Sequence, residues 1–231
     1  MNLDHLPLIS IDQVWTRYKS AGPWVLQNCS LQLFPGERIL IQGPNGSGKS
    51  TLLKVISGLI SPQRGECQHC GHRSCSCAYL AQEHQIDWSL PVTVEEFVWC
   101  GRHSRLRWGL PARRADRQAV AQALREVELY DLRRQPMRAL SGGQRQRLLI
   151  ARTLAQGARI LLLDEPLSGL DSSTRSQLAH ILERICTEHQ LTLVMSTHER
   201  EGFDLRFDRQ VFMQDGQVCR SDGAALVGAA E

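Results

Sequence analysis

The chain has 231 residues, 42% of them hydrophobic, and a formal net charge of +3. This size can bury one sizeable core, and so small a charge argues against a nucleic-acid partner. A membrane helix needs about 18 unbroken apolar residues and a signal peptide needs a basic start before an apolar stretch, and neither pattern is present, so we expect the chain in the cytosol.

Short apolar runs bounded by polar residues or glycine predict strands that are buried on both faces of a parallel sheet. They lie at residues 38–42, 160–165 and 191–198. Residues 114–132 form a helical pattern, with apolar side chains on one face and charges on the other. Strands that alternate with helices favour a doubly wound α/β fold, and the absence of repeats or a long linker favours one compact domain.

The segment GPNGSGKST, residues 43–51, joins the first predicted strand to a helix. Its glycines and its Gly-Lys-Ser ending have the spacing of a phosphate-binding loop. Glycine lets successive backbone N–H groups turn toward phosphate oxygens, Lys49 reaches the β- and γ-phosphates, and the Ser50 hydroxyl suits Mg²⁺. The segment therefore predicts a nucleoside triphosphate site.

Asp164 and Glu165 end the strand at 160–165, at the edge where open α/β sheets bind ligands. Asp164 suits a water-mediated contact to Mg²⁺, and Glu165 suits orienting the attacking water, because phosphoryl transfer depends on positioning and charge neutralisation. His198 ends the next strand, within reach of a γ-phosphate. Adjacent acids and a lone histidine are often structural, and the phosphate loop favours the functional interpretation here.

The segment LSGGQRQR, residues 140–147, predicts a second anion site. Ser141 is a good helix N-cap, and Gly142 and Gly143 leave the helix N-terminus bare, so its hydroxyl, N–H groups and dipole can meet a phosphate. One chain holds a single copy of each anion site. A head-to-tail homodimer that encloses two ATP molecules satisfies both, and the alternative is that Ser141 only caps an ordinary helix.

Together with SGLD at 168–171, these motifs resemble the ATP-binding-cassette (ABC) family of ATPases over nearly the whole chain and in the family's order. The resemblance implies a P-loop NTPase core with a mostly parallel sheet, an antiparallel β subdomain and a helical signature subdomain over about residues 84–157. All three would belong to one ATPase domain spanning residues 1–231. By the same resemblance, His198 matches the family's switch histidine. The family usually has aspartate after that histidine, where this chain has Glu199.

The resemblance also implies roles for individual residues. Tyr18 would stack on adenine, with Trp15 as a rival, Gln82 would link Mg²⁺ and water to the transport partner, and Asp171 would cross the dimer interface. The implied ATP-binding residues are Tyr18, Gly43, Asn45, Gly46, Ser47, Gly48, Lys49, Ser50 and Thr51. The implied catalytic residues are Glu165, His198 and Gln82, the Mg²⁺ ligands are Ser50, Gln82 and Asp164, and the signature residues for the opposite ATP are Ser141, Gly142, Gly143 and Gln144.

Residues 83–105 resemble the manganese, zinc and iron uptake branch of the family. This implies import through a separate membrane permease, a separate substrate-binding protein, and a place at the cytoplasmic face of the cell membrane. Trp88, Leu90 and Phe97 would form the apolar floor of a groove that receives a short permease helix, or they would pack in the core of the subdomain. The alternatives are an ABC ATPase for another substrate and a stand-alone, non-transport ATPase. The arginine-rich segment 101–117 suits either solvent or anionic lipid.

Four cysteines cluster immediately before Gln82, on a predicted hairpin, at Cys67, Cys70, Cys75 and Cys77. Thiolates at this spacing can converge on Zn²⁺ or a similar soft ion, with His69 or His72 as further ligands. Free thiols on a hairpin are the equal alternative. The cluster would be structural or sensory, because it lies outside the predicted ATP site.

Overall fold

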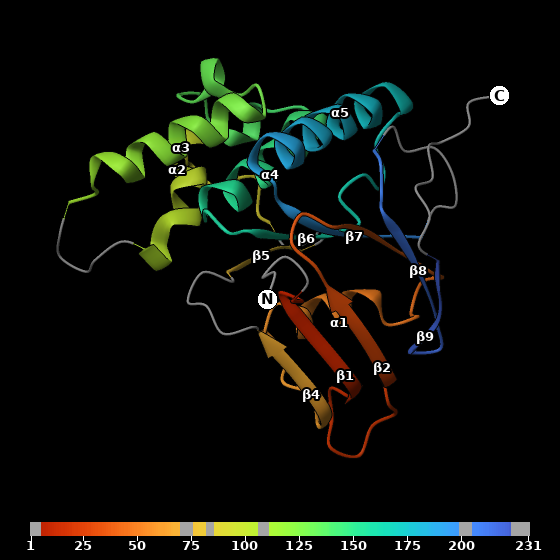
Figure 1. The fold of residues 1–231 in the computed structure, drawn as a ribbon. Helices are drawn as coiled ribbons and strands as arrows, with labels where there is room; N and C mark the ends of the chain where they lie inside the picture. Colours follow the sequence, from red (N-terminus) through yellow and green to blue (C-terminus); the bar gives the residue numbers. More distant parts are fainter. Residues whose placement is uncertain (1–5, 70–75, 82–85, 106–110, 199–204, 223–231) are drawn as a thin grey trace.

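The computed structural model describes residues 6–69, 76–81, 86–105, 111–198 and 205–222. A six-stranded sheet in the order β5-β6-β7-β3-β8-β9 forms its centre (Figure 1). The strands are β3 (Arg38–Gln42), β5 (Cys77–Leu80), β6 (Ile160–Asp164), β7 (Thr192–Thr197), β8 (Arg209–Gln214) and β9 (Gln217–Asp222). All neighbours pair in parallel except β8 and β9. The predicted α/β class with a mostly parallel sheet is confirmed.

A smaller antiparallel sheet has the order β2-β1-β4 and packs over one face of the central sheet. Its strands are β1 (Ile9–Thr16), β2 (Leu26–Leu33) and β4 (Arg64–His69). Helix α1 (Lys49–Ile56) lies between the two sheets (Figure 1). Apolar residues from both sheets and from α1 form one continuous core there.

The other face of the central sheet is covered by helices. They are α2 (Val94–Trp99), η3 (Cys100–Arg105), α3 (Arg114–Glu126), η4 (Tyr130–Leu132), η5 (Met137–Ala139), α4 (Gly142–Ala155) and α5 (Ser172–His189). Strand β3 shows why there are two cores: Ile39 and Ile41 face α1, whereas Leu40 faces the helical layer. Side chains alternate along a strand, so a wholly apolar strand fills both layers at once.

Two predictions about local structure are wrong. The helical pattern at 114–132 stops at Glu126, and Leu132 belongs to the separate turn η4. Glu128 has a left-handed φ of +59°, which an α-helix cannot contain, so the chain turns there although the apolar spacing continues. The predicted hairpin before Gln82 is also wrong, because β4 and β5 belong to different sheets. The predicted limits of a helical subdomain, 84–157, stay a prediction.

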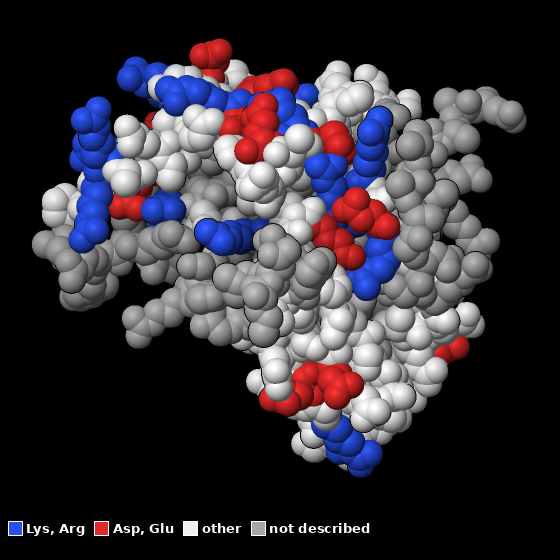
Figure 2. Space-filling model, viewed as in Figure 1, with Lys and Arg blue, Asp and Glu red and all other residues white. Residues whose placement is uncertain are grey.

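The arginine-rich segment divides into a buried part and an exposed part. Arg102 is buried, and its guanidinium donates to Asp116 Oδ1 and to the carbonyl of Ala155 (3.0 Å), which joins η3, α3 and α4. Arg113, Arg114 and Arg117 are exposed at the start of α3. Basic side chains gather on that side of the molecule in Figure 2. Among the arginines of this segment whose side chains the structure describes, Arg113, Arg114 and Arg117 remain available to solvent or to an anionic surface.

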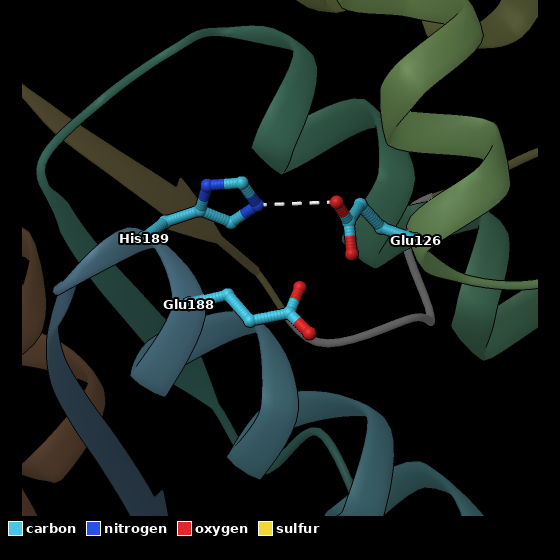
Figure 3. A group of neighbouring side chains, drawn as sticks. All are labelled: Glu126, Glu188 and His189. Atoms are coloured by element: carbon cyan, nitrogen blue, oxygen red, sulfur yellow. Dashed lines mark hydrogen bonds and ion pairs between the residues drawn. The ribbon is translucent and has the colours of Figure 1, made fainter.

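Glu126, at the end of α3, links that helix to the end of α5 (Figure 3). Its buried carboxylate lies 3.1 Å from His189 Nε2 and accepts from Arg184 Nη1 at 3.0 Å. Glu188 also converges on this point, as three metal ligands would, but Arg184 lies 3.9 Å from its carboxylate and pairs with both acids. The cluster is therefore explained as an ion-pair network that holds α3 against α5.

This network makes stability depend on pH. Burial alone would raise the pKa of Glu126, but hydrogen bonds from Gln122 and His189 and the charges of His189 and Arg184 outweigh it and lower that pKa. A lowered folded-state pKa contributes stability above the unfolded value, near 4.3, that is lost as pH falls through the folded value.

We expect Glu126→Gln to lower the urea midpoint at pH 7, because the buried acceptor loses its charge while Arg184 keeps its own. The variant should also lose less stability than the wild type between about pH 5 and pH 3, since it lacks this titration. Urea unfolding followed by circular dichroism across that range measures both effects. Glu188→Gln is the matched control, because Glu188 is exposed. Parallel pH profiles for wild type and Glu126→Gln would contradict the expectation.

Candidate functional site

The predicted phosphate loop connects β3 to α1 and runs beneath the end of β8. A side chain at Gly43 would bring its Cβ to 2.2 Å from the carbonyl oxygen of Met213. Gly48 is the N-cap of α1 with a left-handed φ of +101°, and a Cβ there would meet Leu26 at 2.9 Å. The loop is therefore closely packed against β8 and β2, and only glycine fits at these two positions.

Lys49 begins α1 and is buried, with its side chain 4% exposed. Its ammonium donates to the carbonyl oxygens of Gly43 at 2.8 Å and Pro44 at 3.1 Å, and lies 3.6 Å from Glu165 Oε1. A buried ammonium needs such partners. The positive charge is thus held beside the helix N-terminus, where an anion is favoured twice over.

Asp164 is buried at the carboxyl end of β6, with hydroxyl donors on both sides. Ser196 of β7 donates to Oδ1 at 2.6 Å, and Tyr79 of β5 donates to Oδ2 at 3.1 Å. Burial and the negative charge of Asp164 raise the pKa of Tyr79, so the phenol stays protonated and donates at neutral pH. Asp164 therefore enters the site in a fixed orientation.

Glu165 follows immediately and has a left-handed φ of +51°. Its amide donates to Ser196 Oγ at 3.1 Å, and its Oε2 lies 3.2 Å from His198 Nδ1. The carboxylate thus bridges Lys49 and His198, and it is 11% exposed. The structure brings together these three residues, which the sequence analysis placed in one site from three separate motifs.

Tyr18 and its rival Trp15 have different surroundings. Tyr18 is 61% exposed, and its hydroxyl lies 3.0 Å from Thr51 Oγ1 at the start of α1. The Trp15 ring packs edge-on against Trp24 with 5.5 Å between centroids, and Arg17 covers the Trp24 ring. Trp15 is thus engaged in a packed cluster, whereas Tyr18 is mostly exposed and lies next to the phosphate loop.

The signature segment caps α4 as predicted. Ser141 Oγ accepts from the Gln144 amide and Gln144 Oε1 accepts from the Ser141 amide, a reciprocal capping box. A Cβ at Gly142 would meet nothing within 4 Å, whereas a Cβ at Gly143 would lie 2.5 Å from Thr174 Cγ2. Packing within the described chain therefore explains the second glycine and leaves the first facing open space.

One further contact ties α4 to the segment that follows Glu165. Gln146 is buried, and its amide nitrogen donates to the carbonyl of Pro166 at 2.6 Å. Asp171 is the exposed N-cap of α5, and its carboxylate accepts from the amide of Thr174 at 2.9 Å and from its hydroxyl at 2.7 Å. The hydrogen bonds from Thr174 lower the pKa of Asp171, which keeps the cap charged.

Some predicted residues lie outside the described part of the chain, namely Gln82, Cys70, Cys75 and His72. The described cysteines of the cluster, Cys67 and Cys77, both lie against the C-terminal end of α1. Their Sγ atoms are 3.7 Å from the carbonyl of Val55 and 3.9 Å from that of Ile56. Burial raises the pKa of Cys67, which favours the thiol over the thiolate that a metal requires.

The residues at this edge fit ATP and Mg²⁺. The buried Ser47 hydroxyl has no partner among the described residues, Ser50 is half-buried at the first turn of α1, and Asp164 supplies a hard oxygen donor of the kind Mg²⁺ prefers. Asn45 and Gly46 lie on the exposed tip of the loop. The sequence analysis missed Tyr79 and Ser196, whose place beside Asp164 follows only from the strand order.

Known proteins share both the sequence and the fold. Residues 26–168 match the ABC transporter family. The manganese transport system ATP-binding protein MntB of Halalkalibacterium halodurans is 34% identical over 92% of this chain and 84% of its own length. The thiamine import ATP-binding protein ThiQ of Photorhabdus laumondii is 35% identical over 91% of this chain and 88% of its own.

A solved structure of the ATP-binding cassette MJ0796, a dimer in a post-hydrolysis state bound to ADP and phosphate, matches with a TM-score of 0.78. It is 28% identical and the match covers 93% of this chain and 98% of that one. The family match extends over more than half of the chain and contains the phosphate loop, the signature and the acidic pair. This chain therefore belongs to the ABC transporter family and is one of its ATP-hydrolysing cassettes.

Proposed function

We propose that this ATPase powers the import of a transition metal ion, manganese, zinc or iron, through a separate membrane permease. The observation that carries the proposal is the resemblance of residues 83–105 to the metal-uptake branch, together with the 34% identity to a manganese transport ATPase. Among the helices that the structure describes, none has the length and apolar character needed to cross a membrane. Attachment at the cytoplasmic face of the cell membrane, through the permease, belongs to the proposal, and so does a separate substrate-binding protein.

The proposed chemistry divides the site into binding and hydrolysis. The loop from Gly43 to Ser50, which includes Lys49, binds the phosphates, and Tyr18 stacks on adenine. Ser50, Asp164 and Gln82 hold Mg²⁺, which neutralises phosphate charge when bound. Glu165 orients the attacking water, because its carboxylate is held at the edge of the site between Lys49 and His198. His198 contacts the γ-phosphate, as its position at the end of β7 favours.

The proposed dimer completes the site from a second copy. The Ser141 cap and the amides that follow it form an anion site on α4, separate from the phosphate loop on α1. Gly142 supports this arrangement, because nothing in the described chain requires a glycine there and the helix end faces open space. A head-to-tail pair brings Ser141, Gly142, Gly143 and Gln144 of each copy to the ATP of the other, with Asp171 at the interface.

The proposed permease contact lies beside α2 and α4. Phe97 is 7% exposed and belongs to the core, so of the three predicted groove residues it serves packing. Trp88 lies on Phe97, with 6.2 Å between ring centroids, and the guanidinium of Arg145 lies 5.0 Å from the Trp88 ring. Leu90 is 45% exposed. Trp88 and Leu90 thus remain as the apolar surface for a short permease helix.

Another cargo and a stand-alone ATPase are the alternatives, and the 35% identity to a thiamine import ATPase favours neither metal nor vitamin by identity alone. Copurification from membranes separates transport from stand-alone activity, because a transport cassette brings a hydrophobic permease with it. Uptake of radiolabelled Mn²⁺, Zn²⁺ and Fe²⁺, with thiamine as the comparison, by cells with and without the gene then tests the cargo. Loss of thiamine uptake alone would overturn metal import.

We expect Lys49→Ala to weaken ATP binding by about 10- to 100-fold, because it removes a buried charged donor from the phosphate site. Glu165→Gln should instead keep ATP affinity, lose roughly 100-fold or more in hydrolysis rate and accumulate as a dimer with Mg-ATP. Size-exclusion chromatography and a phosphate-release assay measure these effects. A monomeric Glu165→Gln protein that hydrolyses ATP at the wild-type rate would show that the assigned role is wrong.

We expect Leu90→Glu to abolish metal uptake in cells and to leave the ATPase rate of the isolated subunit within about twofold, since surface substitutions cost little stability. Leu59→Glu is the matched control, because Leu59 is 64% exposed and lies in the segment between α1 and β4. Uptake should survive in the control. Equal loss of uptake in both variants, or loss of ATPase activity with Leu90→Glu, would contradict a permease contact at Leu90.

The cysteine cluster adds a finer proposal, that Cys67, Cys70, Cys75 and Cys77 bind Zn²⁺ or another soft ion. Thiolates so close in sequence repel one another without a cation. The raised pKa of Cys67 opposes the proposal, so metal must supply the energy to ionise it. Elemental analysis should find about one metal ion per chain, which is lost when all four are changed to serine. Equal metal content in both proteins would remove the site.

A further inference from the structure

Three neighbouring strands present polar side chains to the same layer of the molecule. In β6, Ile160 and Leu162 face the core that contains α1, so Asp164, two residues further, shares their face. Val194 of β7 and Tyr79 of β5 pack against the same core. Asp164 pairs in register with Ser196, and Tyr79 pairs with Leu162, which lies two residues before Asp164 in β6. The carboxylate therefore has a hydroxyl-bearing neighbour on each side.

These neighbours hold both carboxylate oxygens of Asp164. The Ser196 hydroxyl donates to Oδ1 at 2.6 Å, and the longer Tyr79 side chain reaches forward to donate to Oδ2 at 3.1 Å. Asp164 is 3% exposed and Ser196 is fully buried, so solvent does not compete for these bonds. Two fixed donors leave the carboxylate one orientation, which a single donor would not.

Ser196 has a second partner. Its Oγ accepts a hydrogen bond from the Glu165 amide at 3.1 Å, and the same hydroxyl donates to Asp164. Glu165 is held at a φ of +51°, a conformation that costs of order 1 kcal/mol or more in a residue other than glycine and needs support from its surroundings. This backbone conformation turns the carboxylate toward Lys49 and His198.

We propose that Tyr79 and Ser196 are positioning residues for ATP hydrolysis: Tyr79 orients the carboxylate of Asp164, and Ser196 orients Asp164 and the backbone of Glu165 together. The inference rests on the roles of Asp164 and Glu165 in the proposed function, and it is independent of the cargo. It predicts two different defects. Loss of the Tyr79 hydroxyl disturbs the metal site alone, whereas loss of the Ser196 hydroxyl disturbs the metal site and the hydrolytic step.

The test compares Tyr79→Phe and Ser196→Ala with the wild type. Fluorescent ATP binding is measured with Mg²⁺ and with EDTA, Mn²⁺ binding to the ATP complex is followed by electron paramagnetic resonance, and ATPase rates are measured across Mg²⁺ concentration. Tyr130→Phe is the matched control, because Tyr130 lies in η4 and its ring packs against Arg125 and Arg133. Equal affinity in EDTA for all proteins establishes that each variant is folded.

Tyr79→Phe should weaken Mn²⁺ binding to the ATP complex about tenfold, the effect of losing one hydrogen bond to a charged group, and raise the Mg²⁺ requirement equally. Excess Mg²⁺ should restore its kcat. Ser196→Ala should show the same metal defect and, in addition, a kcat that stays about tenfold low at saturating Mg²⁺, with KM for ATP little changed. Tyr130→Phe should match the wild type in every measurement.

The inference would be overturned if Tyr79→Phe bound Mn²⁺ as tightly as the wild type. It would also be overturned if excess Mg²⁺ restored the kcat of Ser196→Ala fully. Asp164→Asn separates this failure from a failure of the proposed roles. If Asp164→Asn loses the metal-dependent part of ATP binding while Tyr79→Phe keeps it, only the positioning role is wrong. If Asp164→Asn keeps it as well, Asp164 does not serve the metal and the assignment of the site falls with the inference.

Discussion

The middle strands of the central sheet are buried on both faces, and this constraint decides where chemistry can be placed. Every residue of β6 and β7 is buried, so neither strand offers a polar surface along its length. Reactive groups therefore gather where the strands end. Because β3, β6 and β7 are parallel neighbours, their carboxyl ends lie together, and the loop after each one contributes a different part of a single site.

Lys49 and Glu165 form an ion pair at this edge of the sheet. The Lys49 ammonium donates to carbonyls of its own loop and lies beside the carboxylate of Glu165. That carboxylate also lies beside His198. An uncompensated charge at such depth would be costly, so the residues proposed to serve ATP are also one another's counter-ions. A phosphate entering beside Lys49 competes with Glu165 for the ammonium. If Glu165 has its proposed role, nucleotide binding and its freedom to reach water are linked through the Lys49 ammonium.

The sequence predicted the parts of this site that depend on local spacing. The phosphate loop, the acidic pair after β6 and the cap at Ser141 are each contiguous, and the backbone follows directly from residue type. Contacts between strands could not be predicted in this way. The hydroxyls of Tyr79 and Ser196 are 85 and 32 positions from Asp164, and only strand order and register bring them to its carboxylate.

The two wrong predictions about local structure have related causes. The end of α3 depends on the left-handed turn at Glu128, which apolar periodicity does not report. The predicted hairpin before Gln82 does not form because the two strands, although close in sequence, pair with other strands: β4 with β1 and β5 with β6. Proximity along the chain favours a hairpin only when no longer-range pairing is available.

The attachment of α4 to the residues after Glu165 has a consequence for a dimer. Gln146 bonds to Pro166, and Gly143 lies against Thr174, whose amide is capped by Asp171. The helix end that is proposed to meet the partner's nucleotide is therefore attached to the chain that follows the subunit's own Asp164 and Glu165. In a head-to-tail pair, the proposed anion site on α4 would therefore connect one nucleotide to the residues beside the other. Linkage of this kind is reciprocal, so each nucleotide would change the affinity for the other by the same factor.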